Sequence, residues 1–431
     1  MYRNITAELL EWRQKKDRMP LILYGARQVG KTHILLEFGK KYYQNTAYFN
    51  FENNLTLARY FDGSIEPQKI IMYLETEIRE RITEKTLIIF DEIQVCERAL
   101  TSFKYFNENA PQYHIVCAGS LLGVALNREK YSFPVGNVDS IMMFPLNFEE
   151  FLLAFGEDRL CEEIKNCFDT KTPMPKPLHI KALEYYQKYL LVGGMPRAVR
   201  EYLETNSFIP MNDIQRKILN DYIADSAKYA TSSESVKIRA TYDSIPVQLA
   251  KENKKFQYKL VQKGGTSSIF GVAIDWLESA GIVNKCAKIE TGYFPIDVYR
   301  DLSDFKLYMG DTGLLALKSG ISPSLIFNTC EKIEMQFIGA IAENYVAQCL
   351  TAKKYPLYYW TSGAKAEADF VIQKNDTVVP IEVKAGKNTK SKSLGVFTEK
   401  YKSKYSIRIS TKNFGFDNNI FSVPLYAVWL I

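Results

Sequence analysis

The sequence predicts an α/β protein whose first part is a parallel β-sheet covered by helices on both faces. Two observations support this prediction. Through residues 1–150, short apolar segments alternate with segments of helical periodicity, an order typical of parallel sheets. In addition, a turn bounded by glycines separates the first apolar segment from the first long helical one. The expected strands are 20–25, 47–52, 86–92, 114–120 and 140–145.

Length and composition are those of a globular protein with two or three domains. The chain has 431 residues, of which 46% are hydrophobic and 24% charged, with 28 Tyr and 25 Phe, a composition that excludes extended disorder. Seven scattered cysteines without a C-x-x-C pair argue against a disulfide framework or a zinc site. The charged N-terminus lacks the apolar core of a signal peptide, and no apolar segment is long enough to span a bilayer. We therefore expect a cytoplasmic protein without membrane contacts.

The turn at residues 25–32 is a phosphate-binding motif. It fits the pattern G-x-x-x-x-G-K-[ST] and lies, as this pattern requires, between a strand and a helix. Its glycines allow successive backbone N–H groups to point at an anion, and the helix adds its positive end. Lys31, also a predicted catalytic residue, is expected to reach the β- and γ-phosphates, and Thr32 to bind Mg²⁺. The predicted nucleotide-binding residues are Gly25, Ala26, Arg27, Gln28, Val29, Gly30, Lys31 and Thr32.

Two adjacent acids end the buried strand at 86–92. Asp91 is expected to orient the coordination shell of Mg²⁺. Glu92 is expected to be the catalytic base that activates water for attack on the γ-phosphate. Paired carboxylates at this place are costly without a cation, which favours a catalytic role. Ser120 either holds the attacking water or caps a following helix. No N-K-x-D guanine motif occurs in the chain, so the expected ligands are ATP and Mg²⁺.

These elements resemble the P-loop ATPases of the AAA+ and STAND type, which have an additional strand in the sheet. The resemblance implies that the strand at 114–120 lies between the strand before the phosphate loop and the strand that ends in Asp91. A P-loop metabolite kinase is a third interpretation. Glu92 argues against it, because such kinases lack a catalytic base at this position.

The middle region, residues 156–300, is expected to be mostly helical. A proline-rich break at 169–179 marks a connection near its start. Arg197 and Arg200 follow a glycine-containing turn between two helices. Each of these arginines is either a sensor of the γ-phosphate or a solvated helix residue.

Residues 267–286 of this region resemble a winged helix-turn-helix. The recognition helix would be 269–280, and the hairpin that follows would be the wing. Winged helices bind DNA, but they also serve as protein contacts and as lids of ATPases. The resemblance therefore leaves the partner of this region open.

The last region, residues 301–431, is expected to form a third domain of α/β type. A long helix carries Glu343. In the three strands that follow, Asp369 lies on the second, and Glu382 and Lys384 lie on the third. Because side chains alternate along a strand, Glu382 and Lys384 face the same side.

This constellation resembles the core of the PD-(D/E)XK nucleases, which have a restriction-endonuclease-like fold. The resemblance implies that Asp369, Glu382 and Glu343 bind Mg²⁺ and lower the pKa of a bound water. Lys384 would orient the hydroxide or stabilise the phosphate, which makes Asp369, Glu382 and Lys384 the predicted catalytic residues. Two alternatives remain open: Glu382 and Lys384 form only a structural ion pair, or Glu367 is one of the metal-binding acids.

Basic residues gather near the C-terminus, where Glu399 is almost the only acid. They form either a solvated lysine surface or a contact surface for the phosphates of DNA. These residues are Lys384, Lys387, Lys390, Lys392, Lys400, Lys402, Lys404, Arg408 and Lys412.

The whole chain resembles bacterial and archaeal ATPases that combine an N-terminal AAA-type domain with a C-terminal domain of unassigned function. The resemblance rests on the motifs YGARQVGKT, IIFDEIQ, AGSLL, FPVGNV, LVGGMP, LYMGDTGLL, GAIAENYVA, and EADFVIQ with PIEVKAG. It implies ATP binding and hydrolysis together with a nuclease-related C-terminal fold. Members often carry Arg after the glycine of FPVG, where this chain has Asn137. If that Arg acts in trans, turnover here is slow or differently stimulated.

The sequence therefore leaves two alternative functions open. The first is an ATPase whose nucleotide state gates a DNA-directed, nuclease-like domain. The alternative is a nucleotide-switched regulatory or interaction protein whose nuclease fold is inactive. In both, the expected domains are 1–155, 156–300 and 301–431. DNA is the candidate partner of the winged-helix region and of the basic C-terminal surface, and self-association is a further expectation.

Overall fold

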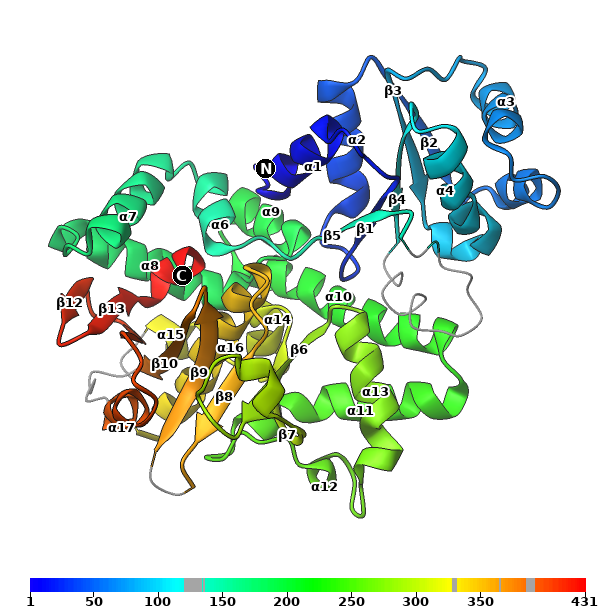
Figure 1. Cartoon of the computed structure of the whole chain (residues 1–431). Coiled ribbons are helices and arrows are strands. Elements are labelled where there is room, and N and C mark those ends of the chain that lie inside the picture. The colour runs from blue at the N-terminus through cyan, green and yellow to red at the C-terminus, as the bar shows by residue number, and fades with distance from the viewer. Residues whose placement is uncertain (120–133, 135, 328–331, 364–365, 385–391) are drawn as a thin grey trace. The chain divides into compact units, whose positions relative to one another are not determined.

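The structure is a computed structural model that describes residues 1–119, 134, 136–327, 332–363, 366–384 and 392–431. These residues form two compact units (Figure 1). The N-terminal unit contains Arg3–Phe144 with Ser279–Gly281, and the C-terminal unit contains Pro145–Glu278 and Ile282–Ile431 with the first two residues of the chain. Three residues of the sequence predictions, Ser120, Lys387 and Lys390, lie outside the described residues.

The N-terminal unit is built on a parallel five-stranded sheet, as the sequence predicts. Its strands are β1 (Leu21–Tyr24), β2 (Asn45–Asn50), β3 (Thr86–Asp91), β4 (His114–Ala118) and β5 (Asp139–Met142). They lie in the order β2-β3-β4-β1-β5, and each neighbouring pair is parallel. The position of β4 between β1 and β3 confirms the strand order that the resemblance to additional-strand ATPases implies.

Helices cover both faces of this sheet. They are α1 (Ile5–Gln14), α2 (Lys31–Tyr42), α3 (Pro67–Ile78) and α4 (Glu97–Asn109), with the short 3₁₀ helices η1 (Leu55–Phe61) and η2 (Ile93–Val95). In Figure 1, α2 lies on one face, and α3 and α4 lie on the other. One apolar cluster joins β2 and β3 to α3 and α4 through Phe49, Phe90, Leu74 and Phe103. Because both faces are covered, β3 is buried along its whole length.

The C-terminal unit begins with the helical region that the sequence predicts. Its helices are α6 (Phe148–Ala154), α7 (Asp158–Thr170), α8 (Lys176–Val192), α9 (Pro196–Thr205), α10 (Phe208–Tyr229), α11 (Ser232–Leu249), α12 (Tyr258–Val261) and α13 (Ser267–Ser279). The segment LVGGMP explains one of the turns between them. Helix α8 ends at Val192 and is followed by its C-cap Gly193, which has a φ of 68°. Helix α9 begins at Pro196, whose ring suits the first turn of a helix.

The second part of this unit is an eight-stranded mixed sheet. Its strands are β6 (Val283–Ile289), β7 (Arg300–Met309), β8 (Tyr358–Thr361), β9 (Glu367–Lys374), β10 (Thr377–Lys384), β11 (Ser406–Ser410), β12 (Gly415–Asp417) and β13 (Ile420–Pro424). They lie in the order β12-β13-β11-β10-β9-β8-β6-β7. The three strands predicted from residues 356–386 are β8, β9 and β10, which pair as antiparallel neighbours.

The hairpin of the predicted winged helix belongs to this mixed sheet. It consists of β6 and β7, and β6 also pairs in parallel with β8. The predicted division between residues 300 and 301 therefore falls at the start of β7, inside the sheet. The backbone groups of β6 form hydrogen bonds with partner strands on both sides. Local sequence patterns do not reveal which strands pair, so they could not place this boundary.

Further helices complete the unit. They are η3 (Ile296–Tyr299), α14 (Thr312–Lys318), α15 (Pro323–Phe327), α16 (Lys332–Ala352), α17 (Lys392–Tyr401) and η4 (Leu425–Leu430). All but α15, which packs against α8, contact the mixed sheet. The long predicted helix at 335–352 is α16, which packs against β6, β7 and β10, whereas α17 packs against β9 and β10. Among the residues described, no helix has both the length and the apolar character needed to cross a bilayer.

A buried aspartate connects the helical region to the mixed sheet. Asp311 follows β7 and is the N-cap of α14, where its Oδ1 accepts a hydrogen bond from the N–H of Leu314 at 3.0 Å. Its Oδ2 accepts a second hydrogen bond from the N–H of Gly194 at 2.7 Å, in the turn between α8 and α9. Burial raises the pKa of the Asp311 carboxyl to about 6, although hydrogen bonds from backbone N–H groups oppose this shift.

We predict that Asp311→Ala lowers the free energy of unfolding of this unit by about 3 kcal/mol, because the change removes a helix cap and leaves a second buried N–H without its acceptor. Urea denaturation followed by circular dichroism measures the loss. The control is Thr231→Ala, which removes the exposed N-cap of α11 and should cost only about 1 kcal/mol. Equal losses in the two variants would contradict the structural role of Asp311.

Candidate functional site

The phosphate loop between β1 and α2 has the geometry of an anion-binding turn. Gly25, Gln28 and Gly30 have φ angles of 141°, 67° and 98°. Positive φ angles of this kind favour glycine. A Cβ atom on Gly25 would lie 2.2 Å from the carbonyl oxygen of Met143, so only glycine fits there. Helix α2 begins directly after Gly30 and directs its positive end at the loop.

Lys31 is held inside this loop. Only 7% of its surface is exposed, and its Nζ donates hydrogen bonds of 2.8 Å to the carbonyl oxygens of Gly25 and Ala26. The loop itself is supported from the N-terminus of the chain, because the Arg3 guanidinium donates to the carbonyl oxygens of Val29 at 2.9 Å and of Phe144 at 2.6 Å. The ammonium group of Lys31 is therefore positioned by the backbone of the loop in which it lies.

Asp91 is the centre of a hydrogen-bond network at the carboxyl end of β3. The Thr32 hydroxyl donates to its two carboxylate oxygens at 3.0 and 3.2 Å. On the neighbouring strand β2, the Tyr48 hydroxyl donates to Oδ2 at 2.7 Å and the Asn50 amide donates at 3.4 Å. The structure thus brings the predicted metal-binding residues Thr32 and Asp91 together, with Tyr48 and Asn50 as supporting donors.

Glu92 lies one residue beyond Asp91 in a left-handed backbone conformation, with a φ of 52°. Its carboxylate accepts a hydrogen bond from the side-chain amide of Gln94. Burial raises the pKa of Glu92 above its ordinary value, and the charge of Asp91 adds to the shift. The Gln94 hydrogen bond and the charge of Lys31 act in the opposite direction. A partly buried carboxylate with a raised pKa suits a residue that takes a proton from water.

The residues at the carboxyl edge of the parallel sheet suit the binding of ATP and Mg²⁺. A hydroxyl and a carboxylate, the oxygen ligands that Mg²⁺ prefers, are already in contact at Thr32 and Asp91. Gly25 and Gly30 have positive φ angles, which allow successive backbone N–H groups of the loop to point at phosphate oxygens. The arrangement can therefore hold a triphosphate and its metal ion and place a carboxylate beside them.

The remaining predicted residues of the ATPase site are placed as follows. The Asn137 side chain accepts a hydrogen bond from Asn107 on α4 at 2.9 Å, which fastens its segment to the sheet's helical layer. Arg197 and Arg200 lie exposed on α9, in the other compact unit. Their role as sensors of the γ-phosphate stays a prediction.

The acids predicted in the C-terminal unit lie on α16, β9 and β10. Asp369 is partly buried, and its Oδ2 accepts a hydrogen bond of 2.7 Å from the N–H of Val383 on β10. Burial and the nearby charge of Glu343 raise the pKa of Asp369 to about 7. Glu382 is buried, and within the described residues its Oε2 atom has no hydrogen-bond partner.

Lysines of the same unit accompany these acids. Lys254 forms an ion pair with Glu343, to which the Tyr308 hydroxyl also donates at 3.3 Å. Although burial acts in the opposite direction, Lys254 and Lys306 hold the pKa of Glu343 below its ordinary value. Lys306 is almost completely buried and forms an ion pair with Glu367. The cluster is thus neutralised largely by its own lysines.

The Glu382–Lys384 ion pair, one alternative that the sequence leaves open, is present with an N–O distance of 2.7 Å. Across the described ranges of the chain, no group of three or more His, Cys, Asp or Glu side chains is arranged to hold a metal ion. The binding of Mg²⁺ by Glu343, Asp369 and Glu382 therefore stays a prediction, as does catalysis by Asp369, Glu382 and Lys384.

Sequence reasoning missed several residues that support these sites. Tyr48 and Asn50 lie on the same face of β2, and two polar side chains of one face near the carboxyl end of this strand were the available signal. Lys306 interrupts the apolar run FKLYM, and a lysine in such a strand indicates a buried acidic partner. Arg3 and Lys254 gave no comparable signal, because their partners lie 26 and 89 residues away in the sequence.

Comparison with protein families agrees with the geometry of the N-terminal unit. Residues 17–152 match the model of a family described as an AAA domain. Two domains of unknown function follow, DUF8612 over residues 183–325 and DUF4143 over residues 338–428. The AAA match contains the phosphate loop, Asp91 and Glu92, and it identifies this unit as a nucleotide-binding ATPase domain. A search of curated proteins gives no match.

The solved structures that this chain matches are distant from it in sequence. A Walker-type ATPase of Pyrococcus abyssi is 15% identical, with a TM-score of 0.45 over 74% of this chain and 95% of that one. The ORC2 protein of Aeropyrum pernix, solved as ADPNP–ADP complexes, is 12% identical, with a TM-score of 0.39 over 74% and 94%. The ORC1 protein of the same organism, in complex with DNA, is 11% identical, with a TM-score of 0.29 over 74% and 93%.

Proposed function

We propose that this protein binds ATP with Mg²⁺ and hydrolyses it. The observation that supports the proposal is the contact of Thr32 with Asp91 beside the buried ammonium of Lys31, with Glu92 as the next residue of the chain. The AAA-domain match covers the same residues. A kinase would need an acceptor site instead of a base, and Glu92 favours water as the acceptor.

Each residue of the site has a separate task in this proposal. The backbone N–H groups of residues 25–32 and the Lys31 ammonium bind the phosphates and stabilise the charge that develops on them. Thr32 and Asp91 would hold Mg²⁺, which neutralises charge on the phosphate oxygens when it is bound. Tyr48 keeps the Asp91 carboxylate oriented. Glu92, held by Gln94, accepts the proton of the attacking water.

We further propose that the nucleotide state controls the C-terminal unit, and that this unit acts as a binding or regulatory module. The supporting observation is the set of ion pairs between lysines and acids in the nuclease-like cluster. Binding of Mg²⁺ between Glu343 and Asp369 would compete with Lys306, which is almost completely buried and has no solvent to move into. The alternative function that the sequence leaves open, a nuclease fold without cleavage, is therefore favoured.

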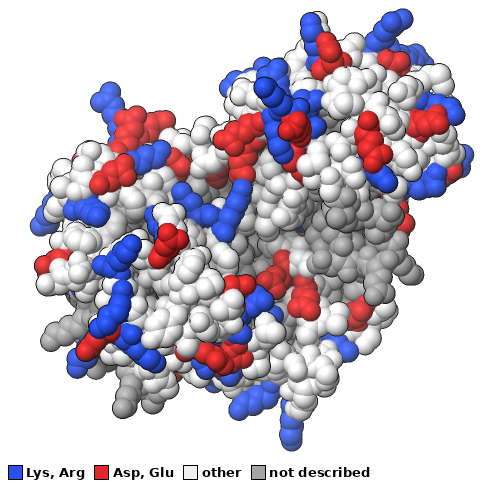
Figure 2. Space-filling view, viewed as in Figure 1, with Lys and Arg blue, Asp and Glu red and all other residues white. Residues whose placement is uncertain are grey.

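DNA remains the candidate partner of this module. The described residues on the face shown in Figure 2 mix basic and acidic side chains, so a contact with phosphates would depend on local groups of lysines such as those near the C-terminus. Lys392, Lys400 and Lys402 there are exposed, and the ammonium of Lys400 also lies over the rings of Trp360 and Tyr401, at 5.7 and 5.0 Å.

We predict that Lys31→Ala abolishes ATP binding in calorimetry, because the phosphates lose their buried cation. Glu92→Gln should bind ATP with unchanged affinity and lose turnover by about a hundredfold or more, because the amide cannot accept the proton. Phosphate release measures turnover. Turnover retained in the Glu92→Gln protein would remove this residue from the role of base.

We predict that kcat rises with pH on the acidic side of its pH profile, because only the deprotonated form of Glu92 can act as base. The midpoint of this rise should lie above the ordinary carboxyl pKa of about 4.3, because burial raises the pKa of Glu92. Gln94→Leu should move the midpoint to higher pH, since the hydrogen bond that opposes the shift is lost. Glu52→Gln should move it to lower pH, since a negative charge that raises this pKa is removed. Midpoints that do not move in opposite directions would contradict the assignment of the limb to Glu92.

We predict that the wild-type protein leaves plasmid DNA intact in the presence of ATP and Mg²⁺ or Mn²⁺, and that Asp369→Ala and Lys384→Ala behave in the same way. Agarose gels of supercoiled plasmid measure the outcome. Degradation by the wild type that is lost in Asp369→Ala would instead support the nuclease-gating function, and the Lys31→Ala protein would then test whether nucleotide binding controls it.

A further inference from the structure

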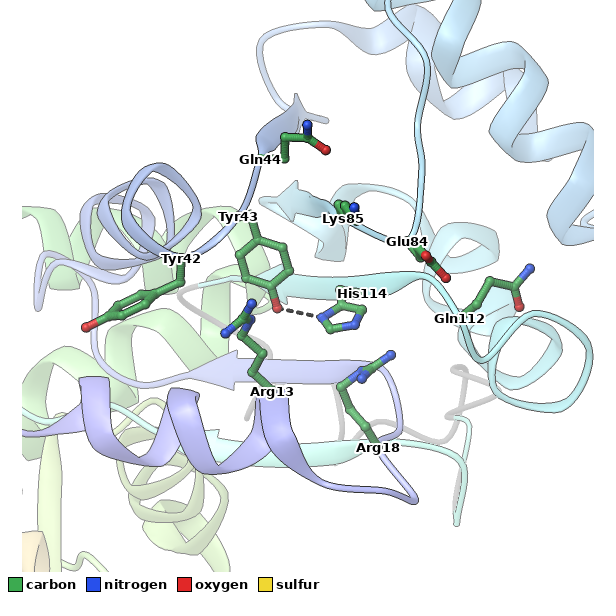
Figure 3. Close-up of a pocket in the computed structure, with 9 residues that line it drawn as sticks. All are labelled: Arg13, Arg18, Tyr42, Tyr43, Gln44, Glu84, Lys85, Gln112 and His114. Atoms are coloured by element: carbon green, nitrogen blue, oxygen red, sulfur yellow. Dashed lines mark hydrogen bonds between the residues drawn. The ribbon is translucent and has the colours of Figure 1, made fainter.

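A cavity lies at the edge of the N-terminal sheet that is opposite the phosphate loop (Figure 3). Its volume is about 550 Å³. Gln44, Lys85 and His114, which precede or begin β2, β3 and β4, contribute to its lining. The phosphate loop follows the carboxyl end of β1, and Asp91 is at the carboxyl end of β3. The cavity is therefore separated from the ATP site by the length of the strands.

Two arginines project into this region from the end of α1 and the segment after it (Figure 3). The Arg13 guanidinium lies 5.1 Å from the centre of the Tyr43 ring. Arg18 lies 5.8 Å from the Trp12 ring and donates to the carbonyl oxygen of Pro111 at 2.9 Å. Burial lowers the pKa of Arg18, and Arg13 contributes in the same direction, so the two cations are close enough to repel each other.

The positive charge of this pair is not compensated within the described chain. No carboxylate of the described residues forms an ion pair with Arg13 or Arg18, and Glu84 is the only acidic residue in the lining. The Nε atom of Arg13 is buried and has no hydrogen-bond partner among the described residues. Two partly buried guanidinium groups without a counter-charge are costly unless an anion accompanies them.

The other polar groups of the cavity are compatible with an anion. His114 accepts or donates a hydrogen bond of 2.6 Å at Nδ1 with the Tyr43 hydroxyl. Burial lowers the pKa of His114 to about 4, with Arg18 and Arg13 acting in the same direction, so the imidazole is neutral at pH 7. Lys85 adds a third cation to the lining. The cavity thus contains three positive charges and one negative charge.

We propose that this cavity is a second anion site, which binds the phosphate group of a small phosphorylated molecule. Two guanidinium groups provide the forked donors that suit phosphate oxygens. The volume is within the range of sites for small ligands. The cations converge on one cavity instead of following a strip of surface, which favours a small molecule over a nucleic-acid backbone.

The three histidines of the chain provide a test that separates the two phosphate sites. His114 reports on the cavity, His33 directly follows the phosphate-loop residue Thr32, and His179 lies on α8 in the other unit. We expect inorganic pyrophosphate, titrated into the full-length protein at low ionic strength, to shift the imidazole NMR signal of His114 saturably and to leave that of His179 unchanged. This shift should persist in Lys31→Ala, whose phosphate loop is impaired.

The variants should change only the response of His114. Arg18→Gln and Arg13→Gln should each weaken pyrophosphate binding at this site by about tenfold or more, because each removes charged hydrogen bonds. Lys85→Gln, at an exposed position where folding is not at risk, should weaken it by about threefold through lost charge. The control Lys16→Gln removes an exposed cation of the same segment that does not line the cavity, and it should have no effect.

Three outcomes would overturn the proposal. The first is a pyrophosphate response confined to His33, which would leave the phosphate loop as the site. The second is equal affinity in the arginine variants and the control. The third is a His114 response to a single-stranded oligonucleotide but not to pyrophosphate, which would make the surface a nucleic-acid contact. ATP binding by the wild type, measured in parallel, tests the proposed ATPase function and does not depend on any of these three outcomes.

Discussion

The contact between Thr32 and Asp91 depends on one topological constraint, the parallel alignment of β1 and β3 with β4 between them. In a parallel sheet the carboxyl ends of all strands meet at one edge, so the loop after β1 and the acids after β3 reach the same place. Burial of β3 on both faces makes this register rigid. The phosphate loop, the proposed base Glu92 and the supporting Tyr48 all take their positions from this alignment.

The carboxylates of the two units have different kinds of partners. At the carboxyl edge of the parallel sheet, Asp91 is held by uncharged donors, Thr32, Tyr48 and Asn50, which leave its negative charge available to a cation. In the C-terminal unit, Glu343 and Glu367 are instead paired with Lys254 and Lys306. A carboxylate that is already paired with a buried ammonium gains less from a metal ion. This difference is the physical basis for proposing catalysis at the first site and a binding role for the second.

Local patterns predicted the elements well and their partners poorly. The five strands of the first sheet, the helix carrying Glu343 and the hairpin carrying Asp369 and Glu382 all appear where periodicity and turn residues placed them. The hairpin β6–β7 was predicted as a wing because its sequence shows two strands and a turn, which is equally true of a hairpin inside a larger sheet. Its pairing with β8 joins segments about 70 residues apart, and no local pattern contains that information.

The sequence by itself determined the phosphate loop and the acids after β3, because the spacing of G-x-x-x-x-G-K-T and the position of Asp91 and Glu92 at a strand end are properties of adjacent residues. Only the tertiary structure decided which groups surround them. Lys306 against Glu367, Tyr48 against Asp91, and Arg13 against the ring of Tyr43 are contacts between distant segments. Such contacts arise from the packing of whole elements, whose free energy is spread over many residues.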